Sequence, residues 1–87
     1  MIRIQYGRDF LRSAKELPKN IQVKLDGLLV LFAHNPYDSR LHTKKLHSEL
    51  IGFLSFRITR DWRVMFQFLD PESVVLLRAK HRKDIYR

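Results

Sequence analysis

Residues 53–81, FLSFRITRDWRVMFQFLDPESVVLLRAKH, decide the fold of this 87-residue chain. They contain three apolar segments, at residues 53–59, 62–69 and 73–81, each rich in β-branched, aromatic or aliphatic side chains. The connections between them are short, and Pro71 stands where a type I turn accepts proline. Because short connections join antiparallel neighbours, this stretch predicts a β-meander.

The chain upstream of the meander is typical of one strand followed by two helices. Residues 2–6 alternate apolar and polar side chains, which predicts a strand that Gly7 ends. We expect Asp9 to cap a first helix, which ends at Pro18 because proline disrupts a helix interior. Residues 19–34 repeat apolar side chains every three or four positions and predict the longer second helix.

Residues 35–50 are polar and basic, and we expect them to form a loop with a short strand near residues 44–46. The resulting order of elements predicts an α+β fold in a single domain over residues 1–87. Its parts are an N-terminal strand, a two-helix hairpin and an antiparallel meander of three to four strands, with both helices on one face of the sheet.

The charge of the chain indicates its class of partner. Seventeen Lys and Arg residues against nine Asp and Glu residues give a net charge of +8, which favours nucleic acid, an anionic membrane or an acidic protein. No cysteine is present, so disulfides and thiolate zinc sites are excluded. The sequence has no apolar run of about 20 residues and no signal-peptide pattern, so we expect a cytoplasmic protein without a membrane partner.

Alternation along the three strands of the meander assigns each side chain to a face. The apolar sets expected against the helices are Leu54, Phe56 and Ile58, then Trp62, Val64, Phe66 and Phe68, then Val75, Leu77 and Ala79. The opposite face would then carry Val74, Leu76 and four cations, Arg57, Arg63, Arg78 and Lys80, with no acid among them. Like charges on adjacent strands repel, so we expect this face to bind a polyanion; the alternative is a face that simply meets water.

Candidates for chemistry lie at the end of the last strand. Parity turns His81 toward the core side, although alternation is unreliable at a strand end, and Tyr86 could reach back across the cationic face. A metal-free set of this kind suits RNA cleavage by attack of the 2′-hydroxyl on the adjacent phosphate. We expect Arg57 and Arg63 to hold the phosphate, His81 and Tyr86 to transfer protons in an order left open, and Lys80 to add positive field.

Other basic side chains are candidates to bind RNA away from the reacting phosphate: Lys44, Lys45, His47, Arg78 and Arg82. The four histidines of the chain show no tight ligand spacing and no accompanying carboxylate cluster. We therefore expect neither a metal site nor a cofactor.

Two segments carry a resemblance to a known family: KKLHSELIGFLSFRITRDWRVMFQF at residues 44–68 and LLRAKHRKDIYR at residues 76–87. With the order of elements, they make nearly the whole chain resemble the RelE/ParE superfamily of type II toxins, in particular its RelE-like and YafQ-like mRNA interferases. The resemblance implies a toxin that an antitoxin neutralises and that cuts mRNA in the ribosomal A site. It places functional positions of the family at Arg57, Arg63, His81 and Tyr86, with a basic residue at Lys80.

Departures from the family leave the general base open. Asp61-Trp62 is similar to the YafQ-like branch, but that branch has a histidine near Arg57 where this chain has arginine. The YoeB-like branch has a catalytic glutamate before the meander, where residues 42–46 read HTKKL. The rival functions are a ParE-like inhibitor of DNA gyrase and a non-catalytic module that binds RNA or the ribosome. The expected partners are mRNA on the ribosome and an acidic antitoxin that is partly disordered or helical.

Overall fold

The predicted meander is present in the computed structural model, which describes residues 1–86. Its strands are β3 (Leu54–Arg57), β4 (Trp62–Asp70) and β5 (Ser73–His81), and a two-residue strand β2 (Lys44–Lys45) precedes them. Upstream lie β1 (Arg3–Tyr6), α1 (Arg8–Lys15) and α2 (Lys19–His34). Two 3₁₀ turns, η1 (Ser39–Leu41) and η2 (Ser48–Leu50), lie on either side of β2. The α+β fold and its order of elements are therefore as predicted, while the two 3₁₀ turns were not anticipated.

The five strands form one mixed sheet in the order β1-β5-β4-β3-β2. The β2 to β5 strands pair antiparallel, and β1 pairs in parallel with the first half of β5, so that the first and last strands of the chain lie side by side at one edge of the sheet. The backbone N–H of Gly7 donates to the Leu76 carbonyl at 2.9 Å. A Cβ at position 7 would lie 2.6 Å from that oxygen, so only glycine permits this contact.

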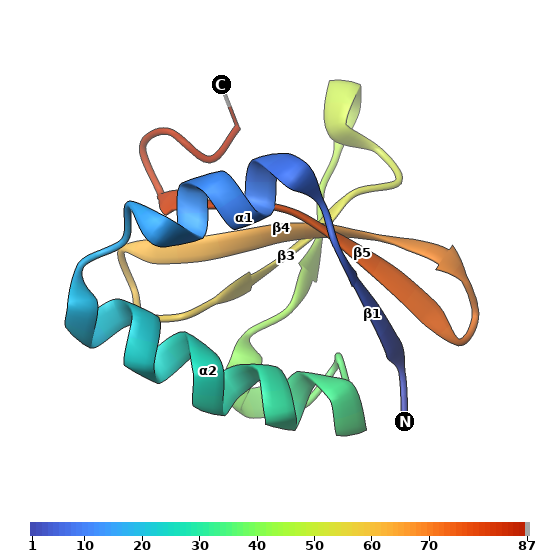
Figure 1. Cartoon of the computed structure of the whole chain (residues 1–87). Coiled ribbons are helices and arrows are strands. Elements are labelled where there is room, and N and C mark those ends of the chain that lie inside the picture. Colours follow the sequence, from blue (N-terminus) through green and yellow to red (C-terminus); the bar gives the residue numbers. More distant parts are fainter. Residues whose placement is uncertain (87) are drawn as a thin grey trace.

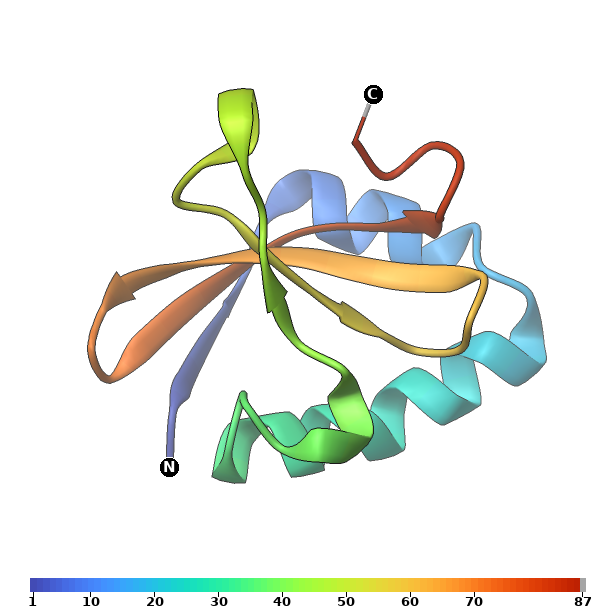
Figure 2. The ribbon, with the colours of Figure 1, turned by 180° about the vertical axis from the view of Figure 1, so that it is seen from behind.

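The two helices reach the core from different directions (Figures 1 and 2). The α2 helix covers one face of the sheet, while α1 lies along the edge of β5 beyond the point where β1 ends. There the Ser13 hydroxyl accepts a hydrogen bond from the Ala79 backbone N–H at 2.9 Å and donates one to the Phe10 carbonyl at 3.1 Å. The edge of β5 is therefore closed by a helix side chain in place of another strand. Gly7, not Asp9, caps α1, and Asp9 lies in its first turn.

Both helices contribute apolar side chains to one main core. Phe32 of α2 is fully buried, with its ring centroid 5.0 Å from that of Phe56 and 4.9 Å from that of Phe66. The α1 helix adds Phe10, and Leu17 just beyond its C-cap is buried as well, whereas Leu11 of α1 is half exposed. These contacts explain why α2 forms over its whole predicted length despite Gly27 in its interior.

A β-bulge in β5 overturns part of the predicted facing. Phe66 pairs with Leu76, but Met65 pairs with Arg78, which leaves Leu77 as an extra residue. Val74 and Leu76 are consequently buried in the main core, and Leu77 packs on the opposite side of the sheet. The assignment of residues 74–77 to faces was therefore wrong. Arg78, Ala79 and Lys80 follow the bulge and face as predicted, since the error is confined to the residues before it.

The face opposite the main core was expected to be open to solvent or a ligand, but part of it is covered. A second, smaller apolar cluster of Leu46, Met65 and Ile85 lies there, and Phe53, Leu77 and Tyr86 pack against it. Ile85 is fully buried, so the C-terminal segment is held down on the middle of this face. Within residues 1–86, no helix has the length and apolar character that crossing a bilayer requires.

Candidate nucleic-acid interface

Three cations stand side by side across three strands, on the face opposite the main core. Arg57 of β3 pairs in register with Arg63 of β4, and Arg63 pairs with Lys80 of β5. Directly opposed like charges destabilise a sheet, and no acid in the part of the chain that the structure describes forms an ion pair with any of the three. We call Arg57, Arg63 and Lys80 the cationic row. Its uncompensated charge is suited to phosphate.

Arg63, at the centre of the cationic row, makes few hydrogen bonds with its guanidinium group. Its Nη2 makes a 3.5 Å hydrogen bond to the Arg60 carbonyl, and its buried Nε has no partner among residues 1–86. A guanidinium is weakly hydrated and presents a planar fork of donors, so it is better suited than an ammonium to partial burial beside an anion. The geometry therefore leaves most of the donors of Arg63 to a ligand.

A second row on the same face carries Tyr86. Lys44, Ser55, Met65 and Arg78 pair in register across four strands, one row inward from the cationic row. The Tyr86 hydroxyl donates to the Ser55 hydroxyl at 3.1 Å, and an Arg78 guanidinium nitrogen donates to the Ile85 carbonyl at 3.5 Å. Burial of Ile85 thus brings the phenol of Tyr86 back over the sheet.

His81 lies on the other side of the sheet from the cationic row, as its parity predicted. It pairs with Trp62, and the two rings meet edge to face with centroids 5.2 Å apart. The backbone N–H of Lys83 donates to His81 Nδ1 at 3.2 Å. Since a backbone N–H can only donate, Nδ1 acts as the acceptor, and the neutral ring carries its proton on Nε2. In this conformation the imidazole offers a donor to its surroundings.

Asp61 fastens the turn after β5 to the β3–β4 hairpin. Its carbonyl accepts from the Arg82 backbone N–H at 2.7 Å, and its carboxylate lies 3.4 Å from the Arg82 guanidinium in a partly exposed ion pair. Arg82 therefore lies at the strand end with its charge largely compensated. This contact holds the segment that carries His81 and Lys83.

Not all of the predicted RNA-binding residues lie in the cationic row or the second row. Lys44 and Arg78 do, as members of the second row. Lys45 and His47 instead line a separate hollow of about 480 Å³ with Phe53 and Phe68. The adjacent residues Lys44 and Lys45 point to different surfaces because neighbours in a strand face opposite ways.

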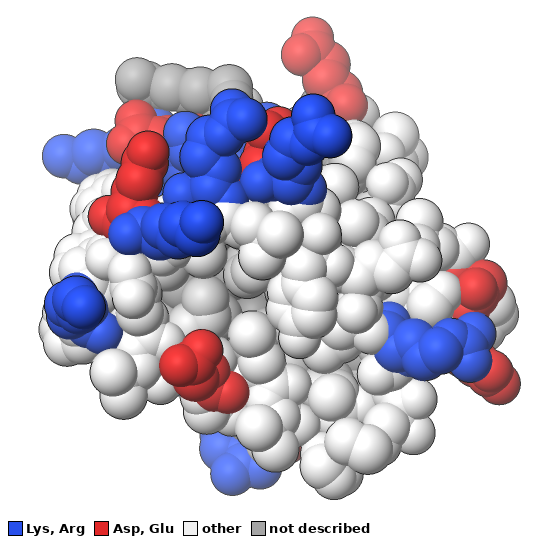
Figure 3. All heavy atoms as spheres, in the orientation of Figure 1, with Lys and Arg blue, Asp and Glu red and all other residues white. Residues whose placement is uncertain are grey.

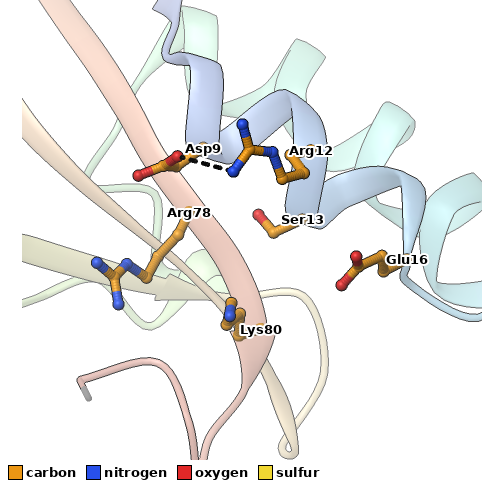
Figure 4. Close-up of a pocket in the computed structure, with 6 residues that line it drawn as sticks. All are labelled: Asp9, Arg12, Ser13, Glu16, Arg78 and Lys80. Atoms are coloured by element: carbon orange, nitrogen blue, oxygen red, sulfur yellow. Dashed lines mark ion pairs between the residues drawn. The ribbon is translucent and has the colours of Figure 1, made fainter.

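Acidic side chains reach the cationic region from α1, which the sequence had not indicated. Figure 3 shows Lys and Arg gathered near α1 and the C-terminal segment, with acidic side chains among them. Asp9 and Glu16 line a hollow of about 270 Å³ with Arg78 and Lys80 (Figure 4). The spacing of Asp9, Ser13 and Glu16 marks one helix face, but nothing in the sequence shows that this face lies against β5.

Among residues 1–86, no group of three or more His, Asp or Glu side chains is arranged to hold a metal ion. The side chains of this region offer guanidinium and ammonium groups for phosphate, and an imidazole and a phenol for proton transfer.

No protein-family model and no curated relative matches the sequence. Solved structures do match. The chain shares 20% identity and a TM-score of 0.80 with YafQ from E. coli strain BL21(DE3), over 100% of both chains. It shares 27% identity and a TM-score of 0.66 with the toxin–antitoxin complex RelBE2 from Mycobacterium tuberculosis, over 93% of this chain and 98% of that one.

A further match is the YoeB–YefM complex from Staphylococcus aureus, with 21% identity, a TM-score of 0.73 and coverage of 92% and 95%. These likenesses show a shared fold over nearly the whole chain, as the sequence resemblance implied. The chain therefore has the fold of the RelE/ParE-like toxin superfamily.

Proposed function

We propose that this protein is the toxin of a type II toxin–antitoxin pair and a metal-independent, ribosome-dependent endoribonuclease. The cationic row is the observation that carries the proposal, because a sheet selected for stability alone would not align Arg57, Arg63 and Lys80 without an acid in ion-pair contact. The resemblance to RelE-like and YafQ-like interferases, and solved neighbours described as toxin–antitoxin complexes, support the same function.

The reaction is cleavage of an RNA strand by its own 2′-hydroxyl. The 2′-oxygen forms a bond to phosphorus as the bond from phosphorus to the 5′-oxygen breaks, which leaves a 2′,3′-cyclic phosphate and a 5′-hydroxyl. The 2′-proton passes to a base, and a proton is delivered to the departing 5′-oxygen. Arg57 and Arg63 hold the phosphate and stabilise its added negative charge, and Lys80 strengthens the field.

His81 and Tyr86 are the groups proposed for proton transfer. The contact from the Lys83 N–H to Nδ1 leaves Nε2–H as the donor of the His81 ring, which favours His81 as the donor to the 5′-oxygen. Tyr86 lies above the second row beside the cationic row. RNA that crosses the end of the sheet contacts the row on one side and His81 on the other, since the end residues of a strand alternate between faces.

The proposed antitoxin offers an acidic segment that orders as it binds the cationic face. Electrostatic docking of this kind weakens with added salt. We expect the dissociation constant of the complex to rise as salt is increased; an affinity that stays constant would exclude charge as the main determinant.

Primer extension on RNA from cells that express the protein tests the nuclease. We expect cuts within translated messages and none in the same messages when translation is blocked. Intact mRNA with trapped gyrase–DNA complexes would instead identify a ParE-like inhibitor.

The His81→Gln variant separates catalysis from binding. We expect it to lose cleavage and growth arrest while it still binds RNA, because glutamine donates a hydrogen bond but does not transfer a proton at neutral pH. Growth arrest that survives the change undiminished would remove His81 from the mechanism and favour a non-catalytic module that binds RNA or the ribosome.

A further inference from the structure

A hollow beside the cationic row has the features of a pocket for a nucleobase. It has a volume of about 330 Å³, at the small end of the range for ligand pockets, and lies between the end of α1 and the ends of β4 and β5. Trp62 and His81 line it from the strands, Glu16 and Leu17 from the helix side, Lys80 from the cationic row and Asp84 from the segment after β5.

The carboxylate of Glu16 is electrostatically unfavourable at this position in two ways. Glu16 is the C-cap residue of α1, where a carboxylate meets the negative end of the helix dipole. It also stands beside Lys80 in a hollow next to a phosphate-binding surface, where its charge repels phosphate. Its side chain has no hydrogen bond or ion pair among residues 1–86 that would explain it structurally. Figure 4 shows this carboxylate directed toward the neighbouring hollow of about 270 Å³, which Glu16 and Lys80 also line.

A carboxylate beside a polyanion is useful where it meets a part of the ligand other than phosphate. Carboxylates accept hydrogen bonds from the exocyclic amino groups of bases, whereas uracil offers a carbonyl oxygen at the corresponding position. Aromatic side chains supply the stacking surface that bases need. Trp62 is only partly buried and lines the hollow with Glu16, so one base could reach both groups.

We propose that this hollow binds one base of the RNA, stacked on Trp62, and that Glu16 selects a base with an exocyclic amino group over uracil. The inference rests on the proposed function, because it takes RNA as the ligand. Lys80 joins the two sites: it belongs to the cationic row and also lines the hollow. A nucleotide whose phosphate lies on the row thus has its base within reach of Glu16.

The single tryptophan of the chain allows a direct test. Deoxyribose pentanucleotides TTCTT and TTUTT differ only in the central base, and they cannot be cleaved by 2′-hydroxyl attack. Titrated into the purified protein, they should quench Trp62 fluorescence, with TTCTT bound at least about tenfold more tightly than TTUTT, the scale expected of one hydrogen bond to a charged group. Equal affinities, or no quenching up to about 1 mM, would overturn the proposal.

The Glu16→Gln variant identifies the selecting group. Its amide can donate to the 4-oxo group of uracil, so the preference for TTCTT should disappear while overall binding persists. Glu49→Gln removes an equal charge from η2, outside the hollow, and should leave the preference unchanged. A preference retained in Glu16→Gln would also overturn the proposal. Because no cleavage is measured, base selection without mRNA cleavage would refute the nuclease alone.

Discussion

The two faces of the sheet are stabilised to very different extents. On one face fourteen buried residues form the main core, which α2 covers and α1 joins from the edge. On the other face three buried residues form the second cluster, and the surface beside them carries the cationic row and the charged residues of the second row. The difference indicates that stability depends mainly on the first face, and that the second can hold repelling charges because it contributes less to folding.

The cationic row is the largest test of this comparison. Arg57→Ala combined with Arg63→Ala should lower RNA cleavage by at least about a thousandfold, since removing one transition-state donor alone commonly costs 10²–10³. The midpoint of urea unfolding should stay the same or rise, because two opposed like charges are removed. The control is Lys15→Ala with Lys19→Ala, which changes net charge equally on the helices. Loss of activity in that control would point to net charge alone.

Phe32 tests the main core. Phe32→Ala should reduce the free energy of unfolding by about 3–5 kcal/mol, because it leaves a cavity between the rings of Phe56 and Phe66. Urea denaturation followed by far-UV circular dichroism measures the change. A loss under about 1 kcal/mol would mean that neighbouring side chains fill the cavity. Close packing on the first face would then contribute less to the free energy of unfolding than its burial indicates.

Ile85 tests the second cluster and its link to Tyr86. Ile85→Ala should cost about 1–2 kcal/mol, less than the 2–5 typical of a core isoleucine, because the terminal segment can detach without unfolding the sheet. Ile85→Ala should also lower the rate of RNA cleavage about as much as Tyr86→Phe does, since the alanine variant no longer holds the phenol of Tyr86 near Ser55. Full core-like destabilisation would show instead that both faces unfold as one unit.

Asp70, an exposed residue at the end of β4, gives the smallest effect. Hydrogen bonds from the Ser73 hydroxyl and the Glu72 backbone N–H hold the pKa of Asp70 below its ordinary value of 3.8. A pKa lowered by folding gives stability that is present above the unfolded pKa and is lost as the pH falls through the folded pKa.

The stability difference between wild type and Asp70→Asn should therefore be constant near neutrality and shrink as the pH drops below 3.8. Thermal unfolding across this range measures it. Asp26→Asn, an exposed change on α2, is the matched control. A difference that does not depend on pH would assign the effect to the turn backbone in place of the carboxylate.

Local periodicity was sufficient to predict the α-helices, the strands of the meander and the cationic row. Residues 19–34 and 73–81 match α2 and β5 to the residue, because apolar spacing and the adjacent proline and turn residues lie within each segment. Arg57, Arg63 and Lys80 were placed on one face by alternation alone, which short strands obey wherever no bulge intervenes. These features depend on neighbours in the sequence.

Tertiary structure decided what depends on distant neighbours. The extra residue Leu77 reversed the facing of residues 74–77, because a bulge forms where the packing of two strands requires it and leaves no periodic mark. Burial of Ile85 against Leu46 and Met65 covered part of a face that alternation left open. The approach of Glu16 to Lys80 arose only when α1 docked on the edge of β5, since these residues are far apart in sequence and meet through packing alone.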